Sequence, residues 1–374
     1  MMDSIQQHSP FEDLPEALVE ELLDQSQRLG YDISTSLKSL HDKKSHHRST
    51  LNKRGLIGKQ SELFDDIHPT TCGIDGSYVV ERLISLDIVA VAAIALEGLT
   101  PPSEINTWDR PHHLCKVVTL PHNESTNVVA RGLMMSMEMV LAEKAPHNVI
   151  FIDNSLTTPF IYYNQALNKI DHANKKLSEP FNEFLERGLL AYLEVLESSK
   201  DRVFVGMPKY TTKNEISYGV LDEDGFEDRG LLTILLEKGE FTRPVPMERP
   251  DSPWHLNRHG TIPDGLTERI IAALDELNVI YYRPHSFQPV FRLEVSRRVA
   301  DDRSKLSALL AAVREQTSMP GLLEPFPLLM ADRMVSKLGS AIPAIRKSST
   351  QTMAEEWVGD FDDVCLSMQG YRTD

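Results

Sequence analysis

The sequence predicts an α/β protein in which helices flank a mixed β-sheet. Apolar runs of strand length occur at residues 72–80, 83–96, 114–120 and 149–152, and a helical pattern covers residues 126–144. Since the first three runs lie close together, they predict a meander with its first turn at Glu81-Arg82. A helix that crosses one face of the sheet then lets the fourth strand return beside the first.

Composition restricts the classes of function. The 374 residues carry a net charge of -16, which argues against binding nucleic acid by bulk attraction, because that attraction comes mainly from Lys and Arg neutralising phosphates. Contact with nucleic acid must then be local, bridged by a metal or shared with a partner. No apolar run approaches the roughly 20 residues of a membrane span, so we expect a cytoplasmic protein that does not enter a membrane.

The N-terminal part predicts a helical extension. Ser9, Pro10 and Glu12 form a helix-start pattern, and Gly30 is the expected end of that helix. A polar, basic connector follows, and the main domain is expected to begin near Phe64. We therefore divide the chain into an extension with its connector, a main domain and an acidic tail, at residues 1–62, 63–345 and 346–374.

Two predicted strands carry an acid beside turn-forming residues. Asp75 precedes Gly76 in the first strand, where glycine is expected to permit a bend, and Asp153 follows the fourth strand and precedes Asn154. If the fourth strand returns beside the first, Asp75 and Asp153 come together. The alternative is that Asp-Gly marks an ordinary tight turn.

The helix at residues 126–144 supplies a third acid. Its apolar positions almost encircle it, so it should be buried, and Arg131 and Glu138 lie close to one stripe. A charge on a buried helix is costly unless it is paired or binds a cation. Glu138 is therefore predicted either to pair with Arg131 or to join Asp75 and Asp153 around a divalent cation, which prefers oxygen ligands.

The remaining elements follow from periodicity. A long helical stretch at about residues 167–200 has heptad-like apolar spacing, and we interpret it as an insertion that forms a homodimer, with core packing as the alternative. An amphipathic helix at residues 266–277 precedes strands at 279–282 and 290–295. The tail after Lys347 is predicted to form an exposed acidic helix.

Several segments together resemble a known family. In their order and spacing over roughly residues 70–345 they are similar to the NurA nucleases. This resemblance implies an RNase H-like fold, metal-dependent cleavage of DNA, and a HerA-type hexameric ATPase as partner in DNA repair by end processing or in antiviral defence. The segments are Asp75-Gly-Ser, the helix with Glu138, Asp153-x-Ser155, Phe204–Lys209, Tyr281–Glu294 and Glu324–Arg333.

The resemblance also implies roles for particular residues. Asp75 and Asp153 would be the principal ligands of Mn²⁺ or Mg²⁺, with Glu138 completing the site. Lys209 would lie near the scissile phosphate, its alternative being an exposed lysine at a strand end. Asp332 lies near a position where archaeal members have His, and it stays a candidate for a metal or water contact. Asn154 stands where Gly is usual, and Asn accepts left-handed backbone angles.

Four further residues are candidates for contact with DNA. Tyr210 follows Lys209 and could stack on a base, although an aromatic at a strand end also serves packing. Arg283, His285 and Arg292 give their segment local positive charge, which suits a phosphate chain and equally suits ion pairs with the many acids.

The expected reaction is metal-assisted phosphodiester hydrolysis. One or two divalent ions would lower the pKa of a bound water and stabilise charge on the attacked phosphate, with Lys209 offsetting part of that charge. Two other classes stay open: a different RNase H-like enzyme of the integrase or Argonaute type, and a non-catalytic subunit of a DNA translocase, in which the acids are structural.

Overall fold

The computed structural model describes residues 11, 14–63, 68–99, 106–198, 201–223, 226–257 and 262–370. The chain forms two compact units, Met1–Arg54 and Gly55–Asp374, which are described separately. The first unit contains one long helix, α1 (Glu16–Lys53). Within the described residues, no helix combines the length and apolar composition that a membrane span requires.

Helix α1 corrects the expected N-terminal layout. It continues through Gly30 to Lys53, so both the helix end at Gly30 and the non-helical basic connector were wrong. One glycine inside a helix costs only about 1 kcal/mol relative to alanine, and the residues on both sides of Gly30 tolerate helix, so the helix is not interrupted. The expected helix start at Ser9, Pro10 and Glu12, and the domain start at Phe64, lie outside the described residues.

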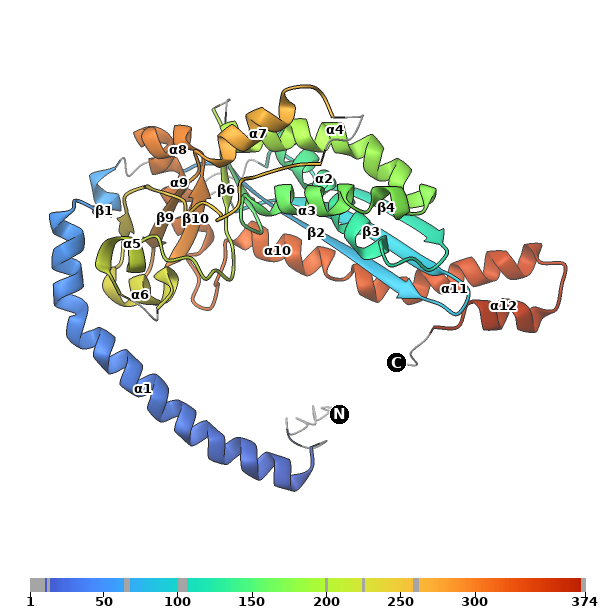
Figure 1. Cartoon of the computed structure of the whole chain (residues 1–374), viewed down its shortest axis with the longest axis horizontal. Coiled ribbons are helices and arrows are strands. Elements are labelled where there is room, and N and C mark those ends of the chain that lie inside the picture. The colour runs from blue at the N-terminus through green and yellow to red at the C-terminus, as the bar shows by residue number, and fades with distance from the viewer. Residues whose placement is uncertain are drawn as a thin grey trace. The chain divides into compact units, whose positions relative to one another are not determined.

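The second unit is built on one mixed sheet of ten strands (Figure 1). Its order is β1-β7-β9-β10-β6-β5-β2-β3-β4, with β8 paired to β9. The strands are β1 (Ile57–Lys59), β2 (Thr71–Arg82), β3 (Asp87–Glu97), β4 (His112–Leu120), β5 (Val149–Ile152), β6 (Val203–Gly206), β7 (Glu240–Thr242), β8 (Val245–Pro246), β9 (Asn278–Arg283) and β10 (Phe291–Val295).

The predicted fold class and strand order are confirmed. Strands β2, β3 and β4 form an antiparallel meander, and β5 returns parallel to β2 with Ile74 opposite Ile152. The first turn lies later than expected, because Glu81 and Arg82 still pair with β3 and the chain reverses over residues 83–86. Strand β6 then pairs in parallel with β5, which places the ends of β2, β5 and β6 near one another.

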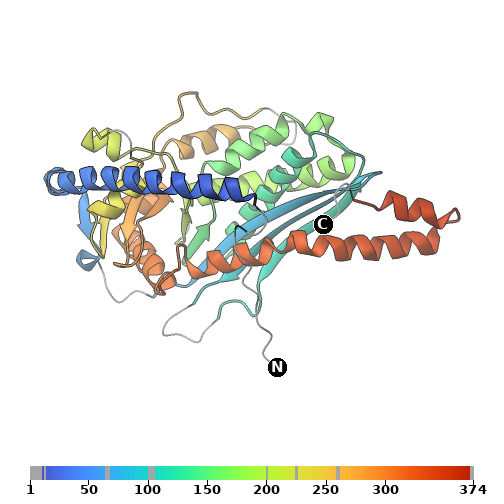
Figure 2. The same cartoon turned by 90° about the horizontal axis from the view of Figure 1, so that it is seen from below.

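Helices cover both faces of this sheet (Figure 2). The helix predicted at Thr126–Lys144 is confirmed as α2, and it shares one core with α3, α4, α7 and strands β2 and β3. Helices α9 and α10 share the opposite core with β5, β6, β9 and β10. The remaining bounds are α3 (Thr158–Leu167), α4 (Lys175–Glu197), α5 (Ser217–Leu221), α6 (Asp228–Leu235), α7 (Leu266–Leu274), α8 (Arg297–Asp301), α9 (Arg303–Gln316), α10 (Phe326–Val335), α11 (Leu338–Glu356) and α12 (Phe361–Ser367), with 3₁₀ turns at Gln60–Glu62 and Ile170–His172.

Helix α4 is the stretch for which dimerisation was predicted. Its apolar side chains, among them Phe181, Leu185 and Leu189, are buried in the chain's own core. The helix lies close to α2, since a Cβ at Gly188 would come within 2.9 Å of the Ser136 Cβ. Core packing therefore accounts for the heptad-like spacing, and the homodimer stays a proposal.

Candidate functional site

The parallel pairing of β2 and β5 brings Asp75 and Asp153 together. The Asp153 amide donates to the Ile74 carbonyl at 3.3 Å, so the ladder continues one residue past β5 and sets Asp153 beside Asp75. Asp75 is only 6% exposed. Two carboxylates from distant parts of the chain thus meet where these strands diverge.

Gly76 serves a different purpose from the one expected. Strand β2 continues without a bend to Arg82, and Gly76 pairs with Ala93, so neither the bend nor a tight turn occurs. A Cβ at Gly76 would collide with Oε1 of Glu138. Gly76 is therefore needed because a carboxylate approaches the backbone closely, which is a known use of glycine inside a strand.

Asp332 joins the two aspartates from helix α10. This helix lies directly on β2, because a Cβ at Gly73 would collide with the backbone of Pro327 and Leu328. One carboxylate oxygen from each of Asp75, Asp153 and Asp332 lies within 4.8 Å of the others. We call these three residues the acidic cluster.

Glu138 lies behind the acidic cluster. Its side chain is 1% exposed, and neither carboxylate oxygen has a hydrogen-bond partner among the described residues. The pairing with Arg131 is absent, because Arg131 instead donates to Gln165 at 2.8 Å and lies over the Tyr162 ring. Burial, and then the charges of Asp75 and Asp153, raise the pKa of Glu138 well above its usual value.

Lys209 brings a cation to the acidic cluster. It follows β6, and its Nζ lies 2.9 Å from Asp153, 3.2 Å from Glu324 and 3.8 Å from Asp332. Glu324 lies in one of the segments that resemble the NurA family, but no role for it was predicted from the sequence. Its position just before helix α10, which carries Asp332, was the available signal.

The acids outnumber the cation, and their pKa values reflect this. Burial and the neighbouring Asp153 raise the pKa of Asp75 from 3.8 to about 8, and burial also raises the pKa of Asp153 despite Lys209. Carboxylate oxygens at this spacing are the ligands that Mn²⁺ and Mg²⁺ prefer, and the unpartnered Glu138 supplies further unsatisfied acceptors. The residues present therefore fit a divalent cation.

The four candidates for DNA contact differ in their exposure and in their contacts within the fold. Tyr210 is 94% exposed, so it is free to stack, and packing does not explain it. The prediction for Arg292 is contradicted, because this side chain is 2% exposed and is bound to Glu215 and Glu294. Arg283 donates to the carbonyls of Thr233, Leu236 and Ser286, which gives it a structural role.

His285 is also tied into the fold. Its Nε2 donates to the Arg314 carbonyl at 3.0 Å, and its ring stacks on Phe287. Of the four candidates, Tyr210 alone combines exposure with a position next to Lys209.

The fold and the acidic cluster define the class of this protein: a mixed α/β protein with a partly buried carboxylate site suited to a divalent cation. The family model of the NurA domain matches residues 69–336, which is more than half of the chain. The chain therefore belongs to the NurA family, as the resemblance predicted.

The chain is also similar to several solved structures. The crystal structure of the NurA nuclease from Sulfolobus solfataricus superposes with a TM-score of 0.58 at 16% identity, covering 92% of this chain and 100% of that chain, and so shows the same fold. A NurA structure with manganese matches at a TM-score of 0.49, 12% identity, and 83% and 94% coverage of this chain and that chain. A NurA structure bound to dAMP and manganese matches with a TM-score of 0.45 at 13% identity, and the match covers 82% of this chain and 93% of that chain. No curated protein gave a match.

Proposed function

We propose that this protein is a divalent-metal-dependent nuclease that hydrolyses phosphodiester bonds of DNA. The observation that carries the proposal is the acidic cluster, in which three carboxylate oxygens lie within 4.8 Å of one another with the Lys209 ammonium beside them. Membership of the NurA family supports it, since a member of similar fold from Sulfolobus solfataricus is a nuclease.

Asp75, Asp153 and Asp332 would hold the cation, Mn²⁺ or Mg²⁺, with Glu138 as the acid behind them. A divalent ion bound there supplies positive charge that lowers the pKa of a water and offsets the charge on the attacked phosphate. Burial and Asp153 raise the pKa of Asp75 to about 8, so Asp75 holds a proton at neutral pH and would have to give it up to serve as a ligand.

Lys209 would act on the phosphate. Its side chain is 37% exposed, so the ammonium can be reached from solvent while Asp153 and Glu324 hold it in place. A fixed cation at this position stabilises negative charge that develops on the phosphate oxygens. Tyr210, the exposed neighbour, would stack on a base of the bound strand.

The test is cleavage of linear and circular DNA with and without Mn²⁺. Asp75→Asn and Asp153→Asn should each lower the rate by about 10³-fold or more, because several kcal/mol of charge stabilisation depend on the cation. Asp171→Asn, at an exposed aspartate in the turn after α3, is the matched control and should cleave like the wild type. Full activity in both cluster variants would contradict the proposal, and absence of Mn²⁺ binding would favour a non-catalytic subunit.

We further propose a HerA-type hexameric ATPase as partner, with a homodimer of this chain acting in DNA repair or antiviral defence in the cytoplasm. The net charge of -16 supports a partner, since a nuclease that receives DNA from an ATPase ring needs little basic surface of its own. Light scattering of the protein alone and with the ATPase tests both assemblies. Cleavage that the ATPase fails to stimulate, with no complex formed, would contradict the partnership.

A further inference from the structure

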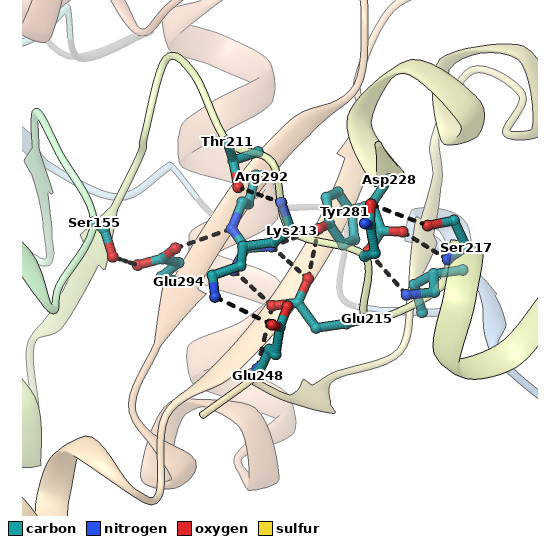
Figure 3. Close-up of polar contacts among 12 residues, drawn as sticks. Ser155, Thr211, Lys213, Glu215, Ser217, Asp228, Glu248, Tyr281, Arg292 and Glu294 are labelled. Carbon is teal, nitrogen blue, oxygen red and sulfur yellow. Dashed lines mark hydrogen bonds and ion pairs between the residues drawn. The ribbon is translucent and has the colours of Figure 1, made fainter. Parts of the chain in front are cut away.

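A second group of polar side chains, which are buried and joined by hydrogen bonds and ion pairs, centres on Arg292 (Figure 3). Arg292 on β10 donates from Nη1 and Nη2 to the two oxygens of Glu215, at 2.8 Å each, and from Nε to Oε1 of Glu294 at 2.9 Å. Tyr281 donates to Glu215 at 3.1 Å. We call Glu215, Tyr281, Arg292 and Glu294 the arginine cluster.

Glu294 extends from the arginine cluster to the turn that carries Asp153. Its second oxygen, Oε2, accepts from the Ser155 hydroxyl at 2.6 Å and from the Leu156 amide at 2.9 Å. The Tyr192 hydroxyl, which is also buried, donates to the Leu156 carbonyl. The residues just after Asp153 are therefore held from both sides.

The held turn has an unfavourable backbone conformation. Asn154 has a φ of 150°, in a region that side chains other than glycine rarely adopt. The turn also lies close against β6, since a Cβ at Gly206 would come within 2.9 Å of the Asn154 carbonyl oxygen. A strained turn persists only where surrounding contacts fix it, and Glu294 supplies two of these contacts.

The other end of the arginine cluster holds the segment with Lys209. Glu215 belongs to the chain that follows β6, as Lys209 does. Burial alone would raise the pKa of Glu215, but the hydrogen bonds and charge of Arg292 outweigh it and lower the pKa to about 2. Arg229 adds a further contact by donating to the Lys209 carbonyl.

We propose that Glu294 is a positioning residue for the metal site: its carboxylate holds the strained turn at residues 153–156, so that Asp153 stays beside Asp75 and Asp332. Arg292 keeps Glu294 in place and ties this turn to the segment that carries Lys209. The inference rests on the proposed function for the role of Asp153 as a metal ligand. That Glu294 holds the turn is inferred from its contacts with Ser155 and Leu156 alone.

The first test measures backbone amide hydrogen exchange in the metal-free protein. Glu294→Gln offers one acceptor oxygen in place of two and cannot serve both Arg292 and the turn, so the Leu156 amide should exchange about 10-fold faster. Ser155→Ala removes one of the two contacts of Glu294 with the turn, so the Leu156 amide should exchange about 5-fold faster. Ser217→Ala removes a buried hydroxyl at the far side of Figure 3, away from the turn, and should leave the Leu156 exchange within about 2-fold of wild type.

The second test is Mn²⁺ binding by calorimetry with the same three full-length variants. Loss of a residue that orients a ligand typically weakens metal binding by about 10- to 100-fold, which we expect for Glu294→Gln, with a smaller loss for Ser155→Ala and none for Ser217→Ala. If Glu294→Gln fails to fold, Ser155→Ala decides.

Unchanged exchange of the Leu156 amide in both Ser155→Ala and Glu294→Gln would show that Glu294 does not hold the turn. An equally large effect of Ser217→Ala would contradict this role as well. Faster exchange with unchanged Mn²⁺ binding would overturn the positioning role. A wild-type protein that does not bind Mn²⁺ would contradict the proposed function, while the exchange data would still decide whether Glu294 holds the turn.

Discussion

The acidic cluster and the arginine cluster both bring acidic side chains together beside the same sheet, and they differ in the partners that these acids have. In the arginine cluster, Glu215 receives two hydrogen bonds from Arg292 and its pKa falls to about 2. In the acidic cluster, Asp75 lies among other acids and its pKa rises to about 8.

This difference indicates that the arginine cluster stabilises the fold, whereas the acidic cluster is suited to bind a cation. Buried charges that serve the fold are paired, because an unpaired buried charge is costly. In the metal-free protein, burial and neighbouring acids instead raise the pKa values of Asp75 and Glu138, which favours their uncharged, protonated forms. A divalent cation bound there would supply the positive charge that favours the carboxylate forms. The two clusters adjoin in the chain, because Asp153 belongs to the acidic cluster and Ser155, two residues later, donates to Glu294 of the arginine cluster.

The largest effect should come from breaking the satisfied cluster. Glu215→Gln leaves Arg292 buried without its two-point partner and should lower the free energy of unfolding by about 3 kcal/mol, measured by urea denaturation. Glu248→Gln is the control, because Glu248 is half exposed and pairs with Lys213 at 3.4 Å, and it should cost less than about 1 kcal/mol. Equal stability of the two variants would remove the contrast between the clusters.

A middle-sized effect is expected where the one cation meets the acids. Lys209→Met should lower the rate of cleavage by about 100-fold, since one fixed charge on the phosphate is lost. It should also tighten Mn²⁺ binding, because the ammonium no longer competes for Asp153. Single-turnover rates and calorimetry measure the two changes. A variant that loses rate and metal affinity together would show instead that Lys209 only holds the site in shape.

Counted per pH unit, the smallest effect is the dependence of stability on pH. In the metal-free native protein Asp75 keeps its proton up to about pH 8, whereas the unfolded chain loses it near 3.8. The native state therefore binds more protons in this interval, and the stability from Asp75 is present below about pH 4 and is lost as pH rises through 8. The slope is at most about 1.4 kcal/mol per pH unit.

Melting temperatures in a chelator at pH 5, 6.5 and 8 measure this slope. The wild type should lose stability over the interval, and Asp75→Asn, which has no titrating group at position 75, should lose less. Mn²⁺ binding should change in the opposite direction and tighten as pH rises, because the cation displaces the proton. Parallel melting curves for the two proteins would show that Asp75 titrates normally.

Local patterns and connection rules were sufficient to predict the frame of the site. The bounds of α2 and β5 follow from apolar periodicity, and the return of β5 beside β2 places Asp75 next to Asp153. The burial of Glu138 could be predicted because apolar residues occupy almost every side of the helix that carries it. These features depend on residues near one another in sequence or on a crossover whose geometry is general.

Contacts between distant segments were beyond such reasoning. Arg292 and Glu294 alternate with apolar residues in β10, a pattern that suits a strand with one face in water, yet the chain after β6 supplies Glu215 and buries them. Gly76 was interpreted from its own neighbours, whereas its need arises from Glu138 on another element. Helix α1 passed Gly30 because a single local signal does not outweigh its surroundings.

The packing of α10 on β2 also sets when the enzyme can become active. Asp332 is contributed by the last helix that the NurA domain model covers in full, so a chain whose synthesis has not reached residue 332 has at most two of the three clustered aspartates. Products of interrupted synthesis that end before residue 332 lack the third aspartate permanently. The full set of three carboxylates can therefore form only after nearly all of the domain has been synthesised.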